Sequence, residues 1–257
     1  MMSTDYRLGL RDNRIMPEDH FGPEVARSYD QSVATMFDPV IVEPALKVLS
    51  ELAGDGRALE FAIGTGRIAL PLTARGIDVR GIELSEAMVQ QLRQKPGGRE
   101  LQVTIGDMTS TRVEGSFRLV YLVFNTIGNL TTQAEQVACF ANAAAHLQPG
   151  GCFVVEVGVP ELRRLPHGER HVVFHADGDS WGIDQYDTAS QALVSHHFRR
   201  EGKGLRHRAI PFRYVWPAEL DLMAQLAGMT LAARWVDWHR HPFRHESTSH
   251  VSVWRKA

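Results

Sequence analysis

The clearest chemical pattern in the sequence is a short apolar run that ends beside an acid and two glycines. Residues 59–62 read Leu-Glu-Phe-Ala, and Gly64 and Gly66 follow with Thr65 between them. Apolar residues then recur at helical spacing from Ile68. Because glycine lets a backbone approach a ligand closely, this succession of strand, turn and helix predicts a nucleotide-binding unit.

Carboxylates stand where three successive strands are expected to end. Glu60 belongs to the first strand, Glu83 ends a second short strand that starts at Val79, and Asp107 follows a third over residues 101–105. In open α/β sheets, ligands bind at the carboxyl ends of the strands. An acid about 20 residues after the glycine turn holds a ribose diol, and we assign this role to Glu83.

The same acids bear on which nucleoside binds. Residues 64–69 satisfy the relaxed dinucleotide pattern, so an NAD(P)-dependent oxidoreductase is one alternative. A pyrophosphate at the end of the first strand would meet the like charge of Glu60, whereas a cationic ligand would be favoured there. Asp107 can accept from an adenine amino group, with Leu84 and Met108 in apolar contact. An ammonium, a sulfonium and a diol occur together in S-adenosylmethionine, the cofactor that we predict.

These motifs resemble the class I S-adenosylmethionine-dependent methyltransferases, from about Tyr29 to the C-terminus. The likeness comprises the E-x-A-x-G-x-G turn, the acid after the second strand, Gly-Asp-Met at 106–108, the fourth strand at 119–125 and Leu-Gln-Pro-Gly-Gly at 147–151. Within that superfamily, the chain is similar to actinobacterial small-molecule enzymes that include amino-sugar N-methyltransferases. It departs from them at Asn129, where the sugar enzymes often carry histidine, and at Ala62, which replaces the first glycine. Alanine fits there if residue 62 needs no positive φ.

The resemblance implies an α/β fold, a Rossmann-like seven-stranded methyltransferase sheet with helices on both faces and an inserted antiparallel β cap. In such relatives, helices near the N-terminus cover the cofactor, which would place Tyr29 at its methionine end. The residues expected to contact the cofactor are Tyr29, Glu60, Ala62, Gly64, Thr65, Gly66, Glu83, Leu84, Asp107, Met108 and Phe124.

The implied reaction is an in-line displacement in which an acceptor nitrogen or oxygen attacks the sulfonium methyl group. An amine with a free lone pair needs no base, whereas an alcohol or phenol does. The catalytic candidates are Glu156, at the end of the fifth strand, and Asn125. A cap histidine such as His196 or His197 is a further possible base. Substrate hydrogen bonding and structural pairing are the alternative roles for the Glu156 carboxylate.

The pattern of the chain divides it into four segments. We expect a mobile N-terminal segment at 1–20, a cofactor-binding core at 21–157, an inserted antiparallel cap at 158–216, and a last helix with two edge strands at 217–257. Turn signals at Asp-Gly 177–178 and at 201–204 predict two hairpins within the cap. The cap and its aromatic residues Trp181, Tyr186, Phe212 and Tyr214 are expected to form the acceptor pocket with Tyr29 and Asn125. A peripheral structural or oligomeric role is the alternative.

Composition agrees with a cytoplasmic enzyme that has one large core. The chain has 257 residues, of which 44% are hydrophobic, and a formal net charge of −2. A charge so near zero does not favour nucleic acid or an anionic membrane, so we expect a small-molecule acceptor. An RNA methyltransferase and a non-catalytic binding module remain alternatives. The oligomeric state and the choice between nitrogen and oxygen stay open.

Neither the cysteines nor the histidines predict a metal site. Cys139 and Cys152 lie in apolar elements, and we expect both in the core. The histidines at 239, 241 and 245 lack the spacing of known zinc motifs.

Overall fold

The computed structural model describes residues 21–202 and 204–257, so segment 1–20, for which the sequence predicts mobility, lies outside the described residues. The main sheet contains β1 (Ala58–Phe61), β2 (Val79–Glu83), β3 (Gln102–Ile105), β4 (Phe117–Leu122), β5 (Leu147–Gly158), β10 (Met229–Trp235) and β11 (Ser249–Lys256). A second sheet contains β6 (His171–Asp177), β7 (Ser180–Asp187), β8 (Ala192–Glu201) and β9 (Gly204–Arg213). The helices are α1 (Pro23–Ser32), α2 (Pro39–Ala53), α3 (Ala69–Ala74), α4 (Glu86–Arg93), α5 (Gln133–His146) and α6 (Pro217–Leu226), with short 3-10 helices η1 (Ala34–Phe37), η2 (Thr126–Asn129) and η3 (Glu161–Arg164).

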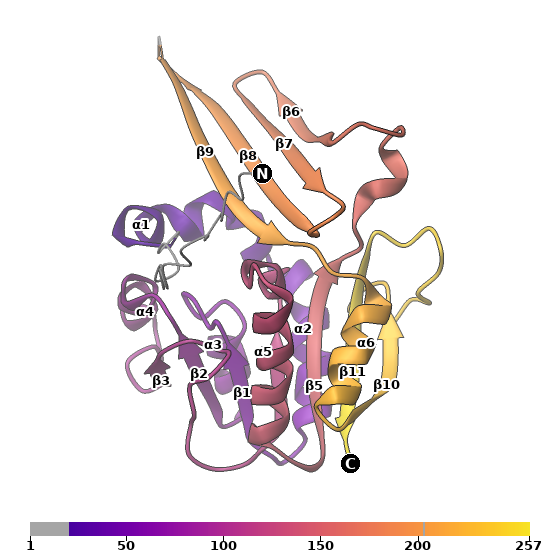
Figure 1. Cartoon of the computed structure of the whole chain (residues 1–257). Helices are drawn as coiled ribbons and strands as arrows, with labels where there is room; N and C mark the ends of the chain where they lie inside the picture. The colour runs from indigo at the N-terminus through magenta and orange to yellow at the C-terminus, as the bar shows by residue number, and fades with distance from the viewer. Residues whose placement is uncertain (1–20, 203) are drawn as a thin grey trace, which may run out of the picture.

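The main sheet has the order β10-β11-β5-β4-β1-β2-β3 (Figure 1). The strands from β1 to β5 pair in parallel, whereas β11 pairs antiparallel with both β5 and β10. The predicted seven-stranded α/β sheet with an antiparallel edge is therefore confirmed. β11 follows β10 in the chain but lies between β10 and β5 in the sheet.

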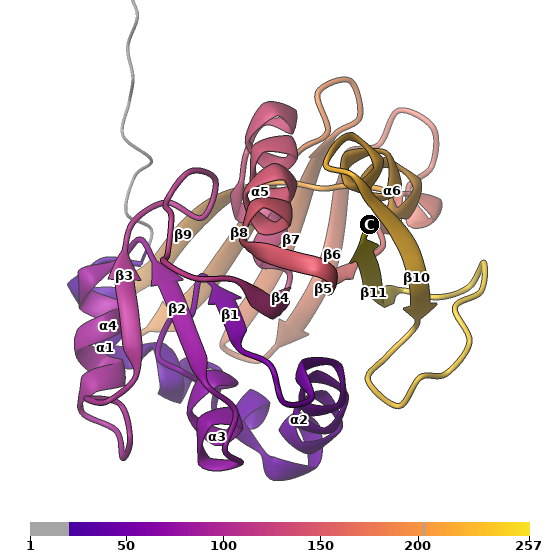
Figure 2. The ribbon, with the colours of Figure 1, turned by 90° about the horizontal axis from the view of Figure 1, so that it is seen from below.

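Alternating side chains divide the core into two layers. Leu59 and Phe61 of β1 belong to the apolar cluster that also contains residues of α5 and α6. Ala58 points the other way, into the cluster with residues of α2 and α3. Figure 2 shows α5 and α6 on one face of the sheet and α2 and α3 on the other. Every side chain from Leu119 to Leu122 in β4 is fully buried, as expected for a central parallel strand.

Local sequence signals place the helices beside the carboxyl ends of the strands. Asp38 caps α2 by accepting from Val40 N–H at 2.9 Å, and Pro39 is the first residue of the helix. A capping box starts α5, in which Thr132 Oγ1 accepts from Glu135 N–H and the Glu135 carboxylate accepts from Thr132 N–H. The start of α5 is thereby fixed beside the end of β4.

The second sheet lies within the segment predicted to be the cap. Its order is β6-β7-β8-β9, and all neighbours are antiparallel, so the two predicted hairpins are confirmed. It stands beyond the end of the main sheet at which β5 leaves it (Figure 1). Arg213, at the end of β9, is buried and donates to Gln136 of α5 and to Glu219 of α6, at 2.7 Å in the second case. These contacts fasten the cap to the helices of the main domain.

Candidate functional site

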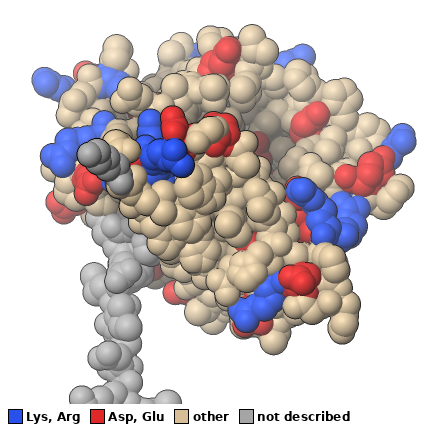
Figure 3. All heavy atoms as spheres, turned by 90° about the horizontal axis from the view of Figure 1, so that it is seen from above, with Lys and Arg blue, Asp and Glu red and all other residues tan. Residues whose placement is uncertain are grey.

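A cavity of about 530 Å³ lies at the carboxyl ends of β1, β2 and β3. Its walls come from α1, from η2 and from β9 of the cap. Seen from this end, the surface is mostly neutral, and charged side chains gather in a few separate groups (Figure 3). Seven of the residues expected to contact the cofactor line this cavity: Tyr29, Ala62, Gly64, Glu83, Leu84, Asp107 and Met108.

Glu83 is held against the glycine turn. Its Oε2 accepts from Gly64 N–H at 2.8 Å, and its Oε1 accepts from Ser85 N–H at 2.9 Å. The side chain is buried, so these bonds fix the carboxylate at the floor of the cavity. Charge-assisted hydrogen bonds of this kind are among the stronger ones, and a carboxylate oxygen can accept more than one hydrogen bond.

The turn adopts left-handed backbone at three of its residues. Gly64 and Gly66 have φ values of 56° and 81°, and Ala62 has 51°. The condition under which alanine would fit without strain, a φ at residue 62 that is not positive, is therefore not met. The chain has to bend sharply where β1 meets the turn, and alanine adopts this conformation at a cost of about 1–2 kcal/mol that glycine avoids.

Asp107 and its neighbours form the far end of the cavity, after β3. Asp107 Oδ1 accepts from Thr109 N–H at 2.7 Å, and Oδ2 has no hydrogen-bond partner among the described residues. Met108 is buried, and Leu84, which follows β2 in the chain, is half exposed. One unengaged carboxylate oxygen beside two apolar side chains suits an adenine amino group and ring.

Glu60 does not line the cavity, although the sequence predicts it at the rim. Its Oε2 accepts from the Tyr121 hydroxyl at 2.9 Å, and only 3% of the residue is exposed. Burial raises the pKa of Glu60 to about 8, with Tyr121 and Arg67 acting in the opposite direction. The alternation of β1 turns this side chain toward the α2 and α3 layer, where β4 presents Tyr121 in register with it.

Tyr29 enters the cavity from α1. Burial raises the pKa of its hydroxyl, and Arg67, Asp30 and Glu83 act on it electrostatically. Its ring meets the ring of Phe21 edge-on, at 6.1 Å between centroids. Tyr29 of α1 and Phe21, just before that helix, therefore supply two aromatic side chains to the wall of the cavity.

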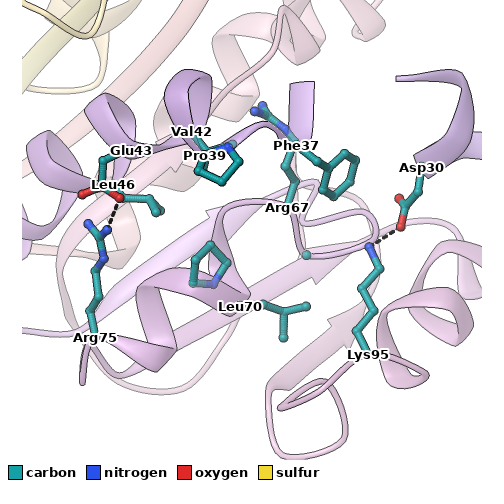
Figure 4. Close-up of a pocket in the computed structure, with 12 residues that line it drawn as sticks. Asp30, Phe37, Pro39, Val42, Glu43, Leu46, Arg67, Leu70, Arg75 and Lys95 are labelled. Carbon is teal, nitrogen blue, oxygen red and sulfur yellow. Dashed lines mark hydrogen bonds and ion pairs between the residues drawn. The ribbon is translucent and has the colours of Figure 1, made fainter. Parts of the chain in front are cut away.

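A second cavity of about 430 Å³ lies on the other side of the glycine turn, under η1 and α2 (Figure 4). Four of its five charged residues form ion pairs, Lys95 with Asp30 and Arg75 with Glu43, and the fifth, Arg67, donates to Met36 O at 3.3 Å. Gly66 lines this second cavity. Thr65 is buried, and its hydroxyl donates to Asp30 at 2.6 Å. Thr65 therefore joins the turn to α1.

The catalytic candidates, Asn125 just after β4 and Glu156 near the end of β5, are not among the described residues that line the first cavity. The Asn125 side chain accepts from Gly158 N–H at 2.6 Å. Glu156 Oε2 accepts from Phe124 N–H at 2.9 Å, and Oε1 accepts from Trp238 Nε1 at 2.8 Å. The Phe124 ring lies under the Arg67 guanidinium, at 5.0 Å. Both Glu156 oxygens are thus engaged within the protein.

Several residues that line the cavity were not predicted from the sequence as site residues. Thr126, Asn129 and Leu130 belong to or follow η2, and Ile210 and Pro211 belong to β9. The position of η2, directly after the end of the fourth strand, could have indicated the first three. β9 lines the cavity because of the way in which the second sheet packs beside the main sheet, and no local sequence signal predicts that packing.

The aromatic cap residues lie elsewhere, in the second sheet or directly after it. Tyr186 and Tyr214 are buried and pack together at 5.6 Å, and the Trp181 ring stacks on Phe198 at 5.6 Å. None of these, nor Phe212, is among the described residues that line the cavity. The cap contributes Ile210 and Pro211 instead.

Two further searches cover residues 21–202 and 204–257. In that part of the chain, no three His, Cys, Asp or Glu side chains are grouped so that they could hold a metal ion. None of its helices has both the length and the apolar character needed to cross a bilayer.

Comparison of the sequence with known proteins gives one family and several relatives. Residues 58–151 match a family model described as a methyltransferase domain. The dTDP-3-amino-3,4,6-trideoxy-alpha-D-glucopyranose N,N-dimethyltransferase of Streptomyces venezuelae is 38% identical over 165 residues. The match covers 58% of this chain and 64% of that enzyme, so the chain spans just under two thirds of this relative's length.

Solved structures resemble most of the chain. The CcbJ methyltransferase from Streptomyces caelestis has a TM-score of 0.81 and 34% identity, covering 92% of this chain and 98% of that one. An amino pentose methyltransferase from Micromonospora echinaspora, solved with bound S-adenosylmethionine, shares the fold with a TM-score of 0.65 and 22% identity, covering 90% and 95%. With the Streptomyces caelestis enzyme matched over nearly its full length, this chain belongs to the S-adenosylmethionine-dependent methyltransferases.

Proposed function

We propose that the protein transfers a methyl group from S-adenosylmethionine to a nitrogen atom of a small molecule in secondary metabolism. The observation that carries the cofactor assignment is the Glu83 carboxylate, fixed at the end of β2 against the Gly64 turn. The relatives named as sugar N,N-dimethyltransferases support nitrogen as the acceptor atom. Family membership removes the support for an oxidoreductase.

The residues of the cavity fit the cofactor's three parts. Glu83 would accept from the ribose hydroxyls, and the unengaged Oδ2 of Asp107 would accept from the adenine amino group. Tyr29 would lie at the methionine end. The bound cofactor supplies an electrophilic methyl group on a sulfonium.

The described lining of the cavity favours an acceptor that attacks without a base. Its carboxylates are Glu83, Asp107 and Glu135, and no histidine or lysine is among the described lining residues. Glu135 is engaged in the capping box of α5. An amine lone pair needs no proton removed before attack, whereas a hydroxyl does. Alignment of the two reactants in the cavity is then the main contribution of the protein.

Two measurements test this function. Calorimetry with S-adenosylhomocysteine should detect binding, and Glu83→Ala should weaken it by about 1.5–3 kcal/mol because hydrogen bonds to a charged group are lost. Glu86→Ala, on the exposed start of α4, is the matched control and should bind like the wild type. Unchanged affinity in Glu83→Ala would contradict the assignment.

The acceptor is tested separately with methyl-labelled S-adenosylmethionine and paired small molecules that differ only in an amino or hydroxyl group. We expect label transfer to the amino compounds. Transfer to the hydroxyl compounds alone would overturn the choice of nitrogen.

A further inference from the structure

The end of β4 has an unusual backbone. Phe124 and Asn125 both have φ near 60°, and neither is glycine. Left-handed backbone costs a non-glycine residue about 1–2 kcal/mol, so two such residues in a row persist only where the surroundings hold them.

Glu156 and its neighbours provide that restraint. The Glu156 carboxylate accepts from Phe124 N–H through Oε2 and from Trp238 Nε1 through Oε1, at 2.9 and 2.8 Å. Its backbone carbonyl accepts from Asn125 N–H at 3.1 Å. Asn125 Oδ1 in turn accepts from Gly158 N–H at 2.6 Å. Three segments far apart in the sequence therefore meet at one carboxylate.

The strained pair connects directly to the cavity. Thr126 and Asn129 follow it in η2, and both line the cavity. The Thr126 hydroxyl donates to Val123 O at 2.7 Å, and Gly128 N–H donates to Asn125 O at 2.9 Å. A change in backbone at residues 124 and 125 would therefore move Thr126 and Asn129.

We propose that Glu156 is a positioning residue for methyl transfer: its two carboxylate oxygens hold the Phe124–Asn125 turn and Trp238, and so fix η2 against the reacting groups. This inference rests on the proposed function for its kinetic readout. It assigns Glu156 no role as a general base, because both oxygens already accept hydrogen bonds and the side chain is not among the described lining of the cavity.

A double-mutant cycle separates the two roles. The glutamine side chain of Glu156→Gln has one carbonyl oxygen, so it can satisfy only one of the two donors and turns its NH2 group toward the other. We expect kcat to fall about tenfold, the equivalent of one hydrogen bond to a charged group, with little change in KM for the cofactor. Trp238→Phe removes one donor. In that background, Glu156→Gln should change kcat by less than about twofold.

A general base behaves differently in the same cycle. It would lose activity equally in both backgrounds, and the acid limb of the kcat/KM profile against pH would disappear in Glu156→Gln. Either result would overturn the proposal. The acid limb should instead be unchanged in every variant of the cycle.

Hydrogen exchange tests the restraint without any acceptor. The Phe124 amide should be protected in the wild type and in the double variant, and should exchange at least tenfold faster in Glu156→Ala, with exchange in β1 as the internal control for folding. Equal protection in Glu156→Ala would overturn the proposal. If the protein bound S-adenosylhomocysteine but methylated no amine, the proposed acceptor would be wrong. The exchange rate of the Phe124 amide would still test the role of Glu156.

Discussion

The Thr65 hydroxyl donates to Asp30 Oδ1 over 2.6 Å, and this bond joins the glycine turn to the helix that carries Tyr29. The other Asp30 oxygen pairs with Lys95, whose ammonium also donates to Thr65 O at 2.8 Å. Figure 4 shows Asp30 and Lys95 facing each other at the edge of the second cavity. One carboxylate thus links α1, the turn and the segment after α4.

Replacement of Asp30 should weaken cofactor binding at a distance. In Asp30→Ala the Thr65 hydroxyl and Lys95 lose their partner, so α1 and Tyr29 are held less firmly over Glu83. We expect about tenfold weaker binding of S-adenosylhomocysteine by calorimetry, equivalent to about 1.4 kcal/mol. Glu24→Ala, on the same helix but in an exposed ion pair with Arg206, is the control and should change affinity by less than threefold. Equal affinities in the two variants would refute the link.

Asp107→Ala should cost less cofactor affinity than Glu83→Ala. Met108 and Leu84 provide apolar contact at the same end of the cavity, so loss of one amino-group hydrogen bond leaves most of the ring buried. We expect a loss of about 0.5–1.5 kcal/mol in calorimetry with S-adenosylhomocysteine. A loss equal to that of Glu83→Ala would reverse the assignment of the two ends.

Ala62→Gly should stabilise the protein. The φ of 51° costs alanine about 1–2 kcal/mol, and glycine offsets part of this gain by its greater freedom in the unfolded chain. The free energy of unfolding in urea should rise by up to about 1 kcal/mol. Ala69→Gly, at the start of α3, is the matched control and should lower the free energy of unfolding by about 1 kcal/mol or more. A decrease in both variants would show that Ala62 is not strained.

Acid should destabilise the protein through His250. The ring is fully buried in β11, its Nδ1 lies 2.8 Å from Ser252 Oγ, and its Nε2 has no partner among the described residues. Burial, aided by Arg234 and opposed by Asp221, lowers the pKa of His250 to about 3. In the unfolded chain the pKa of this histidine is near 6.5, so the unfolded state binds the proton first as pH falls. The stabilisation from neutral His250 is complete above pH 6.5 and is lost as pH falls toward 3.

Urea unfolding at pH 7 and pH 4.5 measures this contribution. The contribution of His250 to the free energy of unfolding should decrease by roughly 2–3 kcal/mol between the two pH values. The total decrease in the free energy of unfolding should therefore be smaller by that amount in His250→Phe, whatever the absolute stability of the variant. His245→Gln, which changes an almost fully exposed histidine, should keep the wild-type pH dependence. The same pH dependence in His250→Phe would contradict the assignment.

Ile210→Ala should separate acceptor turnover from cofactor binding. Ile210 is a cap residue that lines the cavity, whereas Trp181 stacks on Phe198 away from it. We expect Ile210→Ala to lower kcat/KM for the acceptor about tenfold while affinity for S-adenosylhomocysteine stays within about threefold. Trp181→Ala should change neither by more than about threefold. Loss of cofactor affinity in Ile210→Ala would identify the cap as a cofactor lid.

The sequence predicts those parts of the site that depend on local order along the chain. Glu83 and Asp107 could be placed because each follows a short apolar strand, and parallel strands end at one edge. The hairpins of the cap followed from turn residues such as Asp177 and Gly178. In these cases the residues that fix the structure are neighbours in the sequence.

Contacts between distant segments decide the rest. Glu60 lies on the face of β1 that is turned toward α2 and α3, where its partner Tyr121 comes from β4, and the register of these two strands has no local signal. The left-handed pair at Phe124 depends on Glu156 and Trp238 in the same way. Such positions have no local signal in the sequence, because the residues that constrain them lie far away in the chain.

The place of β11 between β5 and β10 constrains the order in which the sheet can assemble. Among the described strands of the main sheet, β10 is paired with β11 alone, so β10 and the α6 helix before it gain a strand partner only once β11 has been made. The edge of the sheet therefore depends on the strand that follows it in the chain. A newly made α6–β10 unit has to wait, with its unpaired strand exposed to other molecules, until the residues that follow it arrive.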